Sequence, residues 1–377
     1  MRSILRSLCI HILAGLLRLF SRKQRAGSPL RVLVVKPDHL GDVLLLTPAL
    51  RALRQRLPQV HIAALVGPWA APILRGNPDV DVVLTCPFPG FTRSTRGPIW
   101  QPYALLLRTA LLLRAGAFDV ALIARDDHWW GALLALAAGI PLRIGFAHPL
   151  VAPALSEALA WDPAEHVTQQ SLALVEALTG RPAESPALRF EPSPADHAWA
   201  AGWLDQRHLG RYPVVAIHPG SGGPAKLWPA ARWAAVADAL GPEVEILITG
   251  GKGEEALVSE VAALMSRPSV QMAGEASIGE LAALYARCAA VLGVDSGPLH
   301  IAVSQGVPTL HLFGPSDQQR FGPWGGERNL VLRSGLWCSP CGVFDRCPRG
   351  TQPAECMALL QVAQVVAAAR RILYNSF

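Results

Sequence analysis

The segment 36–42, with the sequence KPDHLGD, places an acidic residue directly after a glycine. Gly41 allows a tight turn or a close approach of the backbone to a ligand. Asp42 then falls in the first turn of a predicted helix, with His39 just before it. A carboxylate there can act as a general base on a hydroxyl group. It can also simply favour the helix N-terminus, and the residues alone leave both interpretations open.

A second segment, 214–229, has the sequence VVAIHPGSGGPAKLWP and leads from an apolar run into a glycine-rich loop. The small residues Ser221 and Gly222 expose backbone N–H groups, and Lys226 adds a full positive charge. A predicted helix begins beside Pro229. This combination suits the binding of phosphate, although an ordinary loop remains the alternative. The spacing is not that of a Walker A loop, and no predicted strand leads into G-x-G-x-x-G, which disfavours a dehydrogenase.

A third segment, 291–300, has the sequence VLGVDSGPLH and passes from a predicted strand into a helix. Asp295 or Ser296 can cap that helix. Alternatively, the Asp295 carboxylate can hold ligand hydroxyls, beside the backbone of Ser296 and Gly297. His300 lies one turn inside the helix, where a structural role is the simpler interpretation.

Two acids follow another predicted strand in the segment 250–255, with the sequence GGKGEE. Acids in this position bind ribose hydroxyls in other nucleotide sites. Glu254 and Glu255 both qualify, and both can equally be acids at a helix N-terminus.

Four cysteines cluster near the C-terminus with the spacing C-x₂-C-x₅-C-x₈-C, at Cys338, Cys341, Cys347 and Cys356. They can form a structural zinc or iron site, although the spacing is not that of a common zinc ribbon. A reduced loop is the alternative, since disulfides are disfavoured in the cytoplasm. A catalytic role is not expected.

Short apolar runs alternate with helical segments throughout the chain, which predicts an α/β protein with parallel sheets. A proline-rich stretch at 179–194 marks a junction between two such series. We therefore predict an N-terminal domain at 29–185 and a second at 186–355, followed by a helix at 356–377. The candidate loops follow strands, where ligands of such sheets bind. The predicted strands are 31–36, 60–66, 81–85, 119–124, 213–217, 244–248, 290–294 and 308–313, and the predicted helices are 41–57, 103–114, 230–240, 254–265, 278–287, 298–305 and 354–373.

The net charge of +6 comes from the N-terminus and not from a groove across the fold. Residues 1–37 hold eight Lys and Arg residues and no acid, which leaves 26 basic against 28 acidic residues elsewhere. This distribution argues against a nucleic-acid partner.

The segment 1–28 is apolar and basic, but its longest stretch without Arg or Lys is 11 residues. A membrane-spanning helix needs about 20, and no signal-peptide cleavage site follows. We therefore expect a cytoplasmic protein. The segment is interpreted either as an interfacial helix resting on anionic lipid or as a helix packed on the body of the protein.

In order and spacing, these motifs resemble glycosyltransferase family 9, the heptosyltransferases of the lipopolysaccharide inner core. The resemblance runs from about Arg31 to Cys356 and is carried by VKPDHLGDVLLLTPALRALR, HPGSGGPAKLWP, GVDSGPLHIAVSQGVPTLHLFGPSD and CSPC. It implies a GT-B fold of two facing Rossmann-like domains, with the acceptor in the first and the nucleotide sugar in the second. It also implies that the last helix crosses back to the first domain.

The resemblance implies an inverting transfer of heptose from ADP-heptose to a lipid A–core or similar acceptor. Asp42 would be the catalytic base, with His39 and Gly41 on the acceptor side. The donor would be held by Ser221, Gly222, Lys226, Glu254 or Glu255, Asp295, Ser296, Gly297 and His300. No metal or other cofactor is required by this mechanism, because Lys226 and a helix N-terminus stabilise the departing diphosphate.

Two other functions remain open from the sequence. One is a GT-B enzyme with another nucleotide-sugar donor, or an epimerase, although the GD and DSGPLH motifs fit an epimerase poorly. The other is a non-catalytic module that binds a nucleotide, against which the presence of Asp42 and Lys226 argues.

Overall fold

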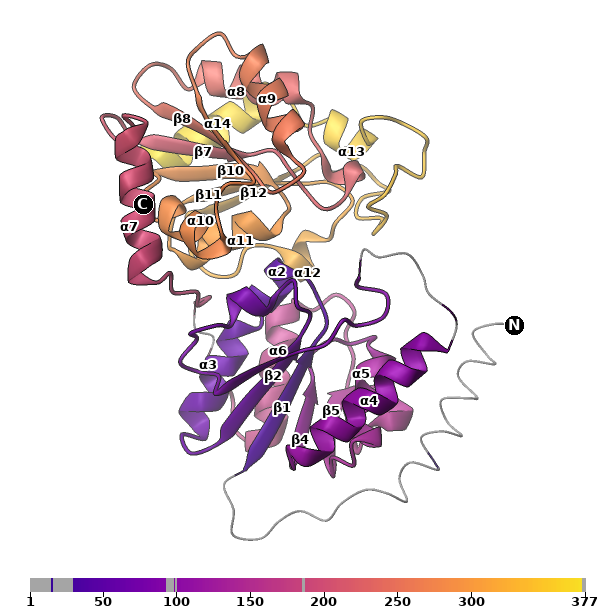
Figure 1. Ribbon diagram of the computed structural model, residues 1–377. Coiled ribbons are helices and arrows are strands. Elements are labelled where there is room, and N and C mark those ends of the chain that lie inside the picture. Colours follow the sequence, from indigo (N-terminus) through magenta and orange to yellow (C-terminus); the bar gives the residue numbers. More distant parts are fainter. Residues whose placement is uncertain (1–14, 16–29, 93–97, 99, 185–186, 375–377) are drawn as a thin grey trace. The chain divides into compact units, whose positions relative to one another are not determined.

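The computed structural model describes residues 15, 30–92, 98, 100–184 and 187–374. The chain divides into two compact units, residues 1–186 and 187–377, and each is built on a six-stranded parallel sheet flanked by helices (Figure 1). The interpretations of segment 1–28 fall outside the described residues, apart from Gly15.

The first unit has the strand order β3-β2-β1-β4-β5-β6. Side chains of β1 alternate between the two faces of the sheet, as expected for a strand buried on both sides. Leu33 and Val35 join the apolar core formed with α4 and α5, whereas Val34 lies with residues of α3 and α6. The strands are β1 (Arg31–Lys36), β2 (His61–Val66), β3 (Val82–Thr85), β4 (Val120–Ile123), β5 (Leu142–Phe146) and β6 (Glu157–Leu159), and the helices are α2 (Leu40–Leu44), α3 (Thr47–Arg56), α4 (Gln101–Ala115), α5 (Trp129–Ala137) and α6 (Val167–Thr179).

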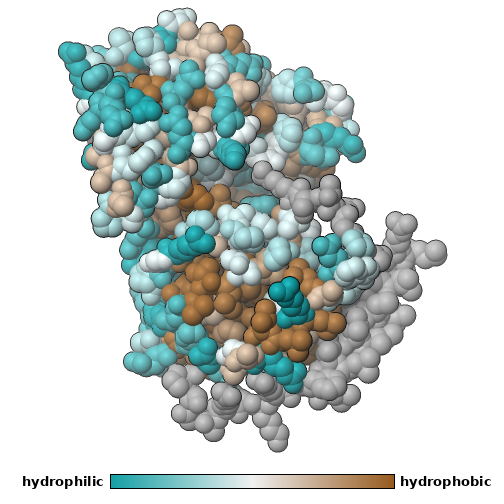
Figure 2. Space-filling model, in the orientation of Figure 1, coloured by the Kyte–Doolittle hydropathy of each residue, from teal (hydrophilic) through white to brown (hydrophobic). Residues whose placement is uncertain are grey.

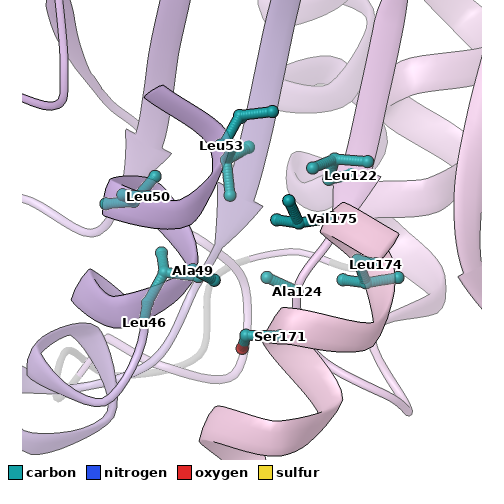
Figure 3. A pocket seen from close by; sticks show the side chains of 10 residues that line it. Leu46, Ala49, Leu50, Leu53, Leu122, Ala124, Ser171, Leu174 and Val175 are labelled. Atoms are coloured by element: carbon teal, nitrogen blue, oxygen red, sulfur yellow. The ribbon is translucent and has the colours of Figure 1, made fainter. Parts of the chain in front are cut away.

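A small gap in the packing of this unit lies between α3, α6 and the sheet (Figure 3). Leucines of α3 point across it toward Leu122, Leu174 and Val175. Its volume of about 10 Å³ is at the lower limit for one water molecule. It is therefore a packing defect of the core and too small for a substrate.

The second unit repeats the same topology, with the order β12-β11-β10-β7-β8-β9. Its core packs α8, α9 and α14 on one face of the sheet, while α10 packs against α7 and α11. The strands are β7 (Val214–His218), β8 (Glu245–Gly250), β9 (Val270–Ala273), β10 (Ala290–Val294), β11 (Thr309–Phe313) and β12 (Asn329–Arg333), and the helices are α7 (Pro194–Gln206), α8 (Ala230–Ala239), α9 (Glu255–Leu264), α10 (Ile278–Tyr285), α11 (Gly297–Ser304), α12 (Gln318–Phe321), α13 (Glu355–Ala358) and α14 (Val362–Tyr374).

The helix predicted over 41–57 is two helices, α2 and α3, and the cause is local. Pro48 has no N–H to donate to the carbonyl four residues earlier, which belongs to Leu44. The Thr47 hydroxyl donates to that carbonyl instead, at 2.7 Å. The chain therefore turns between Leu44 and Thr47, and the short helix α2 keeps Asp42 next to the end of β1.

The last predicted helix is also divided, into α13 and α14. The Arg232 guanidinium donates to the carbonyl oxygens of Ala358 and Leu360, both at 2.6 Å, and so satisfies backbone groups at the break. The expected crossing of this helix back to the first domain stays a prediction. The buried side of α14, with Val365, Ala369 and others, packs into the core of the second unit.

Candidate active site

Each sheet has a switch point, where the order of the strands along the chain reverses. In open α/β sheets, ligands bind beside this point, at the carboxyl ends of the strands. In the first unit it lies between β1 and β4, and in the second between β7 and β10. The ends of these four strands and the loops that leave them carry most of the charged residues described below. Each unit therefore presents one polar cluster.

In the first unit, Lys36 and Asp38 at the end of β1 meet Arg125 and Asp127 after β4. The Lys36 ammonium donates to the Ala124 carbonyl at 2.8 Å and lies 3.2 Å from the Asp38 carboxylate. Arg125 forms ion pairs with both acids, Asp38 and Asp127. These bonds join the two strand ends across the switch point.

Asp38 is buried but remains a carboxylate in this cluster. Burial alone would raise its pKa, but the charges of Lys36 and Arg125 outweigh that effect and hold the pKa well below its ordinary value. The Arg125 side chain is 30% exposed, and its guanidinium lies 5.1 Å from the centre of the Phe91 ring. Arg125 is thus a fixed cation at the surface that can face an anionic ligand group.

His128 is buried beside this cluster, and neither ring nitrogen has a hydrogen-bond partner among the described residues. Its ring packs edge-on against Phe88 and Phe91. Burial, together with the nearby cations, lowers the pKa of His128 from 6.5 to about 4. The imidazole is therefore neutral at neutral pH.

This lowered pKa predicts a pH-dependent stability. An unfolded chain protonates His128 near pH 6.5 and the folded one only near pH 4, so its contribution is present above pH 6.5 and is lost as the pH falls toward 4. Between pH 7.5 and 4.5, wild type should lose about 2–3 kcal/mol more unfolding free energy than His128→Phe, measured by urea denaturation. The same substitution at the exposed His197 is the control for the removal of a histidine. Parallel curves for wild type and His128→Phe would contradict the neutral buried state.

The sequence-predicted residues of the first unit lie next to this cluster. His39 is the exposed residue before α2, and its ring centre lies 5.8 Å from that of Trp69. Gly41 is buried, and Asp42 is half-buried in the first turn of α2. Asp38, Arg125 and His128 were not selected from the sequence. The signal for the last two was the sequence RDDH directly after the predicted strand 119–124.

In the second unit, Lys226 pairs with Asp295 across the switch point. The ammonium lies 2.6 Å from the carboxylate, and the Ser221 hydroxyl donates to the Asp295 carbonyl at 3.4 Å. Burial opposes ionisation of Asp295, but the Lys226 charge keeps the pKa of this carboxyl below its ordinary value. The structure therefore brings together three residues predicted from two separate segments.

Glu254 lies in the loop after β8, as the N-cap residue of α9, close to the glycine-rich loop. Its carboxylate accepts from the Gly251 N–H at 2.7 Å and lies 3.6 Å from Nε2 of His218. A side chain at Gly220 would overlap this carboxylate, with a Cβ only 2.2 Å from it. Glycine is thus needed at 220 for the loop to pass over Glu254.

A buried polar network lies next to Glu254, and the sequence analysis did not predict it. Nδ1 of His218 is 3.0 Å from the Thr249 hydroxyl, which is 2.8 Å from the Tyr285 hydroxyl. Burial lowers the pKa of His218 and raises that of Tyr285. The network is neutral and fixes the His218 ring toward Glu254.

The remaining predicted residues of this unit are Glu255, Ser296, Gly297 and His300, and they differ in burial and in position. Glu255 is exposed, and its carboxylate accepts from the Gly253 N–H at 2.9 Å. Gly297 begins α11, and Ser296 is its N-cap residue with a hydroxyl that has no partner among the described residues. His300 is buried one turn into that helix.

The cysteine-containing segment packs on the glycine-rich loop. The Phe344 carbonyl accepts from the Ala225 N–H at 3.0 Å, and the Phe344 ring lies 4.5 Å from the Lys226 ammonium. A Cβ at Gly223 would come within 2.8 Å of Phe344, so glycine permits this contact. The segment thereby holds Lys226 in position.

No metal site was found at the four clustered cysteines. Across 30–92, 100–184 and 187–374, no group of three or more His, Cys, Asp or Glu side chains is placed to hold a metal ion. Cys356 is buried beside Gly314, whereas Cys341 is exposed. The spacing suggested a ligand set, but the loop packs these side chains in different environments.

Two Rossmann-like units, each built on a six-stranded parallel sheet, are the architecture of the GT-B fold, and solved heptosyltransferases share this fold. The sequence model of glycosyltransferase family 9 (heptosyltransferase) matches residues 106–347, more than half of the chain. The protein belongs to this family and is a glycosyltransferase.

Similar proteins agree with this assignment. Lipopolysaccharide heptosyltransferase 3 of Escherichia coli is 26% identical over 344 residues, which cover 89% of this chain and 97% of that protein. The structure of a family 9 glycosyltransferase from Veillonella parvula DSM 2008 matches with a TM-score of 0.77 and 26% identity over 92% of this chain and 98% of that one. The E. coli ADP-heptose lps heptosyltransferase II has the same fold, with a TM-score of 0.70 and 22% identity over 91% and 98% of the two chains.

Among the described helices, none is long and apolar enough to cross a membrane.

Proposed function

We propose that this protein transfers a heptose from ADP-heptose to a lipopolysaccharide inner-core acceptor, with inversion at the anomeric carbon. Family membership supports the transferase chemistry, and the names of the similar proteins support the donor and the acceptor class. The observation that carries the proposal is the Lys226–Asp295 pair beside a glycine-rich loop at the switch point of the second sheet.

The second unit holds the donor in this proposal. Lys226 and the loop around Ser221 and Gly222 bind the diphosphate. The backbone N–H groups of Ser296 and Gly297 at the start of α11 add positive potential on the other side. Glu254 and Glu255 are the candidates for the ribose hydroxyls, and the position of Glu254 beside Gly220 favours it.

The first unit supplies the base. Asp42 accepts the proton of the acceptor hydroxyl as its oxygen forms a bond to the anomeric carbon. The bond from that carbon to the diphosphate oxygen breaks, and its electron pair leaves with ADP. Lys226 stabilises the negative charge that develops on the diphosphate. His39 and Gly41 lie on the acceptor side, where Arg125 can pair with an anionic group of the acceptor.

The acceptor in this proposal is linked to lipid A and lies at a membrane surface. The protein then works as a peripheral protein on the cytoplasmic face of the inner membrane. Residues 1–37 hold eight basic residues and no acidic residue, which supports such a location.

Calorimetric titration of the full-length protein with ADP, GDP and UDP, without added metal, tests the donor. We expect ADP to bind at least about tenfold more tightly than GDP or UDP, because a tenfold preference needs only about 1.4 kcal/mol of base-specific contacts. Transfer from ADP-heptose to a lipid A–core fragment is the confirming assay. Preference for GDP or UDP would keep the fold and change the donor, whereas binding without transfer would support an inert nucleotide-binding module.

A further inference from the structure

Helix α4 of the first unit has apolar side chains on two sides. One side, with Leu106, Ala110 and Leu113, is buried in the core against α5. The other side remains exposed and forms a stripe at helical spacing that begins just before the helix. Its large members are Trp100, Tyr103, Leu107, Leu111 and Leu112, with exposed fractions of 64, 48, 59, 70 and 69%.

This stripe is unusual for the surface of the protein. Elsewhere among the described residues, large exposed apolar side chains are dispersed, such as Leu264 and Leu359 in the second unit. Dispersed residues of this kind need no explanation, whereas a contiguous patch marks an interaction surface. Figure 2 shows apolar side chains gathered on the first unit over α4.

The charge around the stripe selects the kind of partner. Residues 82–118 contain four arginines, two of which are Arg108 and Arg114 in α4, and no acid. No acidic residue occurs in α4, and Arg108 is exposed. Leucines between arginines, with a tryptophan and a tyrosine at one end, are the composition of a helix that lies in a lipid interface.

We propose that the exposed face of α4 docks the protein on an anionic membrane surface. Leu107, Leu111 and Leu112 enter the boundary between headgroups and acyl chains, and Trp100 lies at the headgroup level. Arg108 pairs with lipid phosphates. The surface belongs to the first unit, and the inference rests on the peripheral location proposed above, for which it names the contact face.

Flotation of the full-length protein with vesicles of phosphatidylethanolamine containing one quarter phosphatidylglycerol tests the proposal. The variant Leu111→Gln/Leu112→Gln should lower the vesicle partition coefficient at least about tenfold, because two buried leucines are lost. Arg108→Gln should lower it about fivefold on these vesicles and leave binding to neutral phosphatidylcholine vesicles unchanged.

The matched control is Leu264→Gln/Leu359→Gln, which changes two exposed leucines of the second unit and should leave flotation within about twofold of wild type. ADP titration of each variant shows whether the second unit is intact, and it is independent of membrane binding. The proposal is overturned if Leu111→Gln/Leu112→Gln floats like wild type. A second variant, Leu16→Gln/Leu17→Gln, tests the N-terminal segment, and the proposal is overturned if this variant alone lowers flotation. It is also overturned if the α4 variant changes only the melting temperature or the oligomeric state. Those results would mean that the chain itself or a second copy covers the face.

Discussion

Replacing Asp42 by alanine is expected to abolish transfer while the affinity for ADP stays nearly unchanged. Loss of a general base lowers kcat by about 10²- to 10⁴-fold. Asp42 lies in the first unit, after β1, whereas the proposed diphosphate ligands lie in the second. Single-turnover transfer from ADP-heptose and calorimetric titration with ADP measure the two effects separately.

Asp42→Asn distinguishes a base from a helix-capping acid. Asparagine keeps the size of the side chain and an oxygen for the free N–H groups of α2, but it cannot take a proton at neutral pH. We therefore expect Asp42→Asn to be as inactive as Asp42→Ala and to melt like wild type. If Asp42→Asn retains most of the activity, Asp42 caps the helix and another residue is the base.

The chain offers a matched control for this substitution. Asp196 also lies in the first turn of a helix, α7, where it forms a capping box with Ser193. Asp196→Asn should cost at most about 1 kcal/mol of stability and leave transfer unchanged. Equal losses of activity in Asp42→Asn and Asp196→Asn would point to a general effect of weakened helices.

The fold was predictable because short apolar runs alternate with helical segments along the chain, and this pattern repeats in both units. Val32–Val35 and Val291–Val294 are buried completely in central strands, so their continuous apolar runs stand out in the sequence. Four strands were missed. Of these, β6, β9 and β12 are sheet-edge strands with mostly exposed or half-buried residues, and a weak apolar pattern leaves them indistinct. The fourth, β5, lies inside its sheet, but the charged Arg143 interrupts its apolar run although it is buried. The break at Pro48 was also readable, since proline at the second helical position typically marks a helix start.

The site was predictable only where residues follow one another along the chain. Ser221, Lys226 and Asp295 stood out because glycines and charges follow a strand in each of their loops. The His218–Thr249–Tyr285 network joins a strand end, a neighbouring strand and a helix. Its members look like ordinary core residues until the topology places them together.

Lys226→Ala is expected to weaken ADP binding about 10- to 100-fold, the effect of losing one charged hydrogen bond to the diphosphate. The same change should destabilise the second unit by about 3 kcal/mol, because the Asp295 side chain is only 8% exposed and loses its partner. Titration with ADP and thermal unfolding measure these effects. Unchanged affinity would count against the phosphate role.

These two effects have to be separated, since a destabilised loop also binds poorly. The double variant Lys226→Ala/Asp295→Asn removes both charges of the pair, and its stability should return toward that of wild type. The affinity for ADP should stay low, because the diphosphate still lacks its cation. If the affinity for ADP instead recovers together with stability, the role of Lys226 is to pack the loop against Phe344. The backbone N–H groups of the glycine-rich loop and of α11 would then bind the diphosphate without the Lys226 charge.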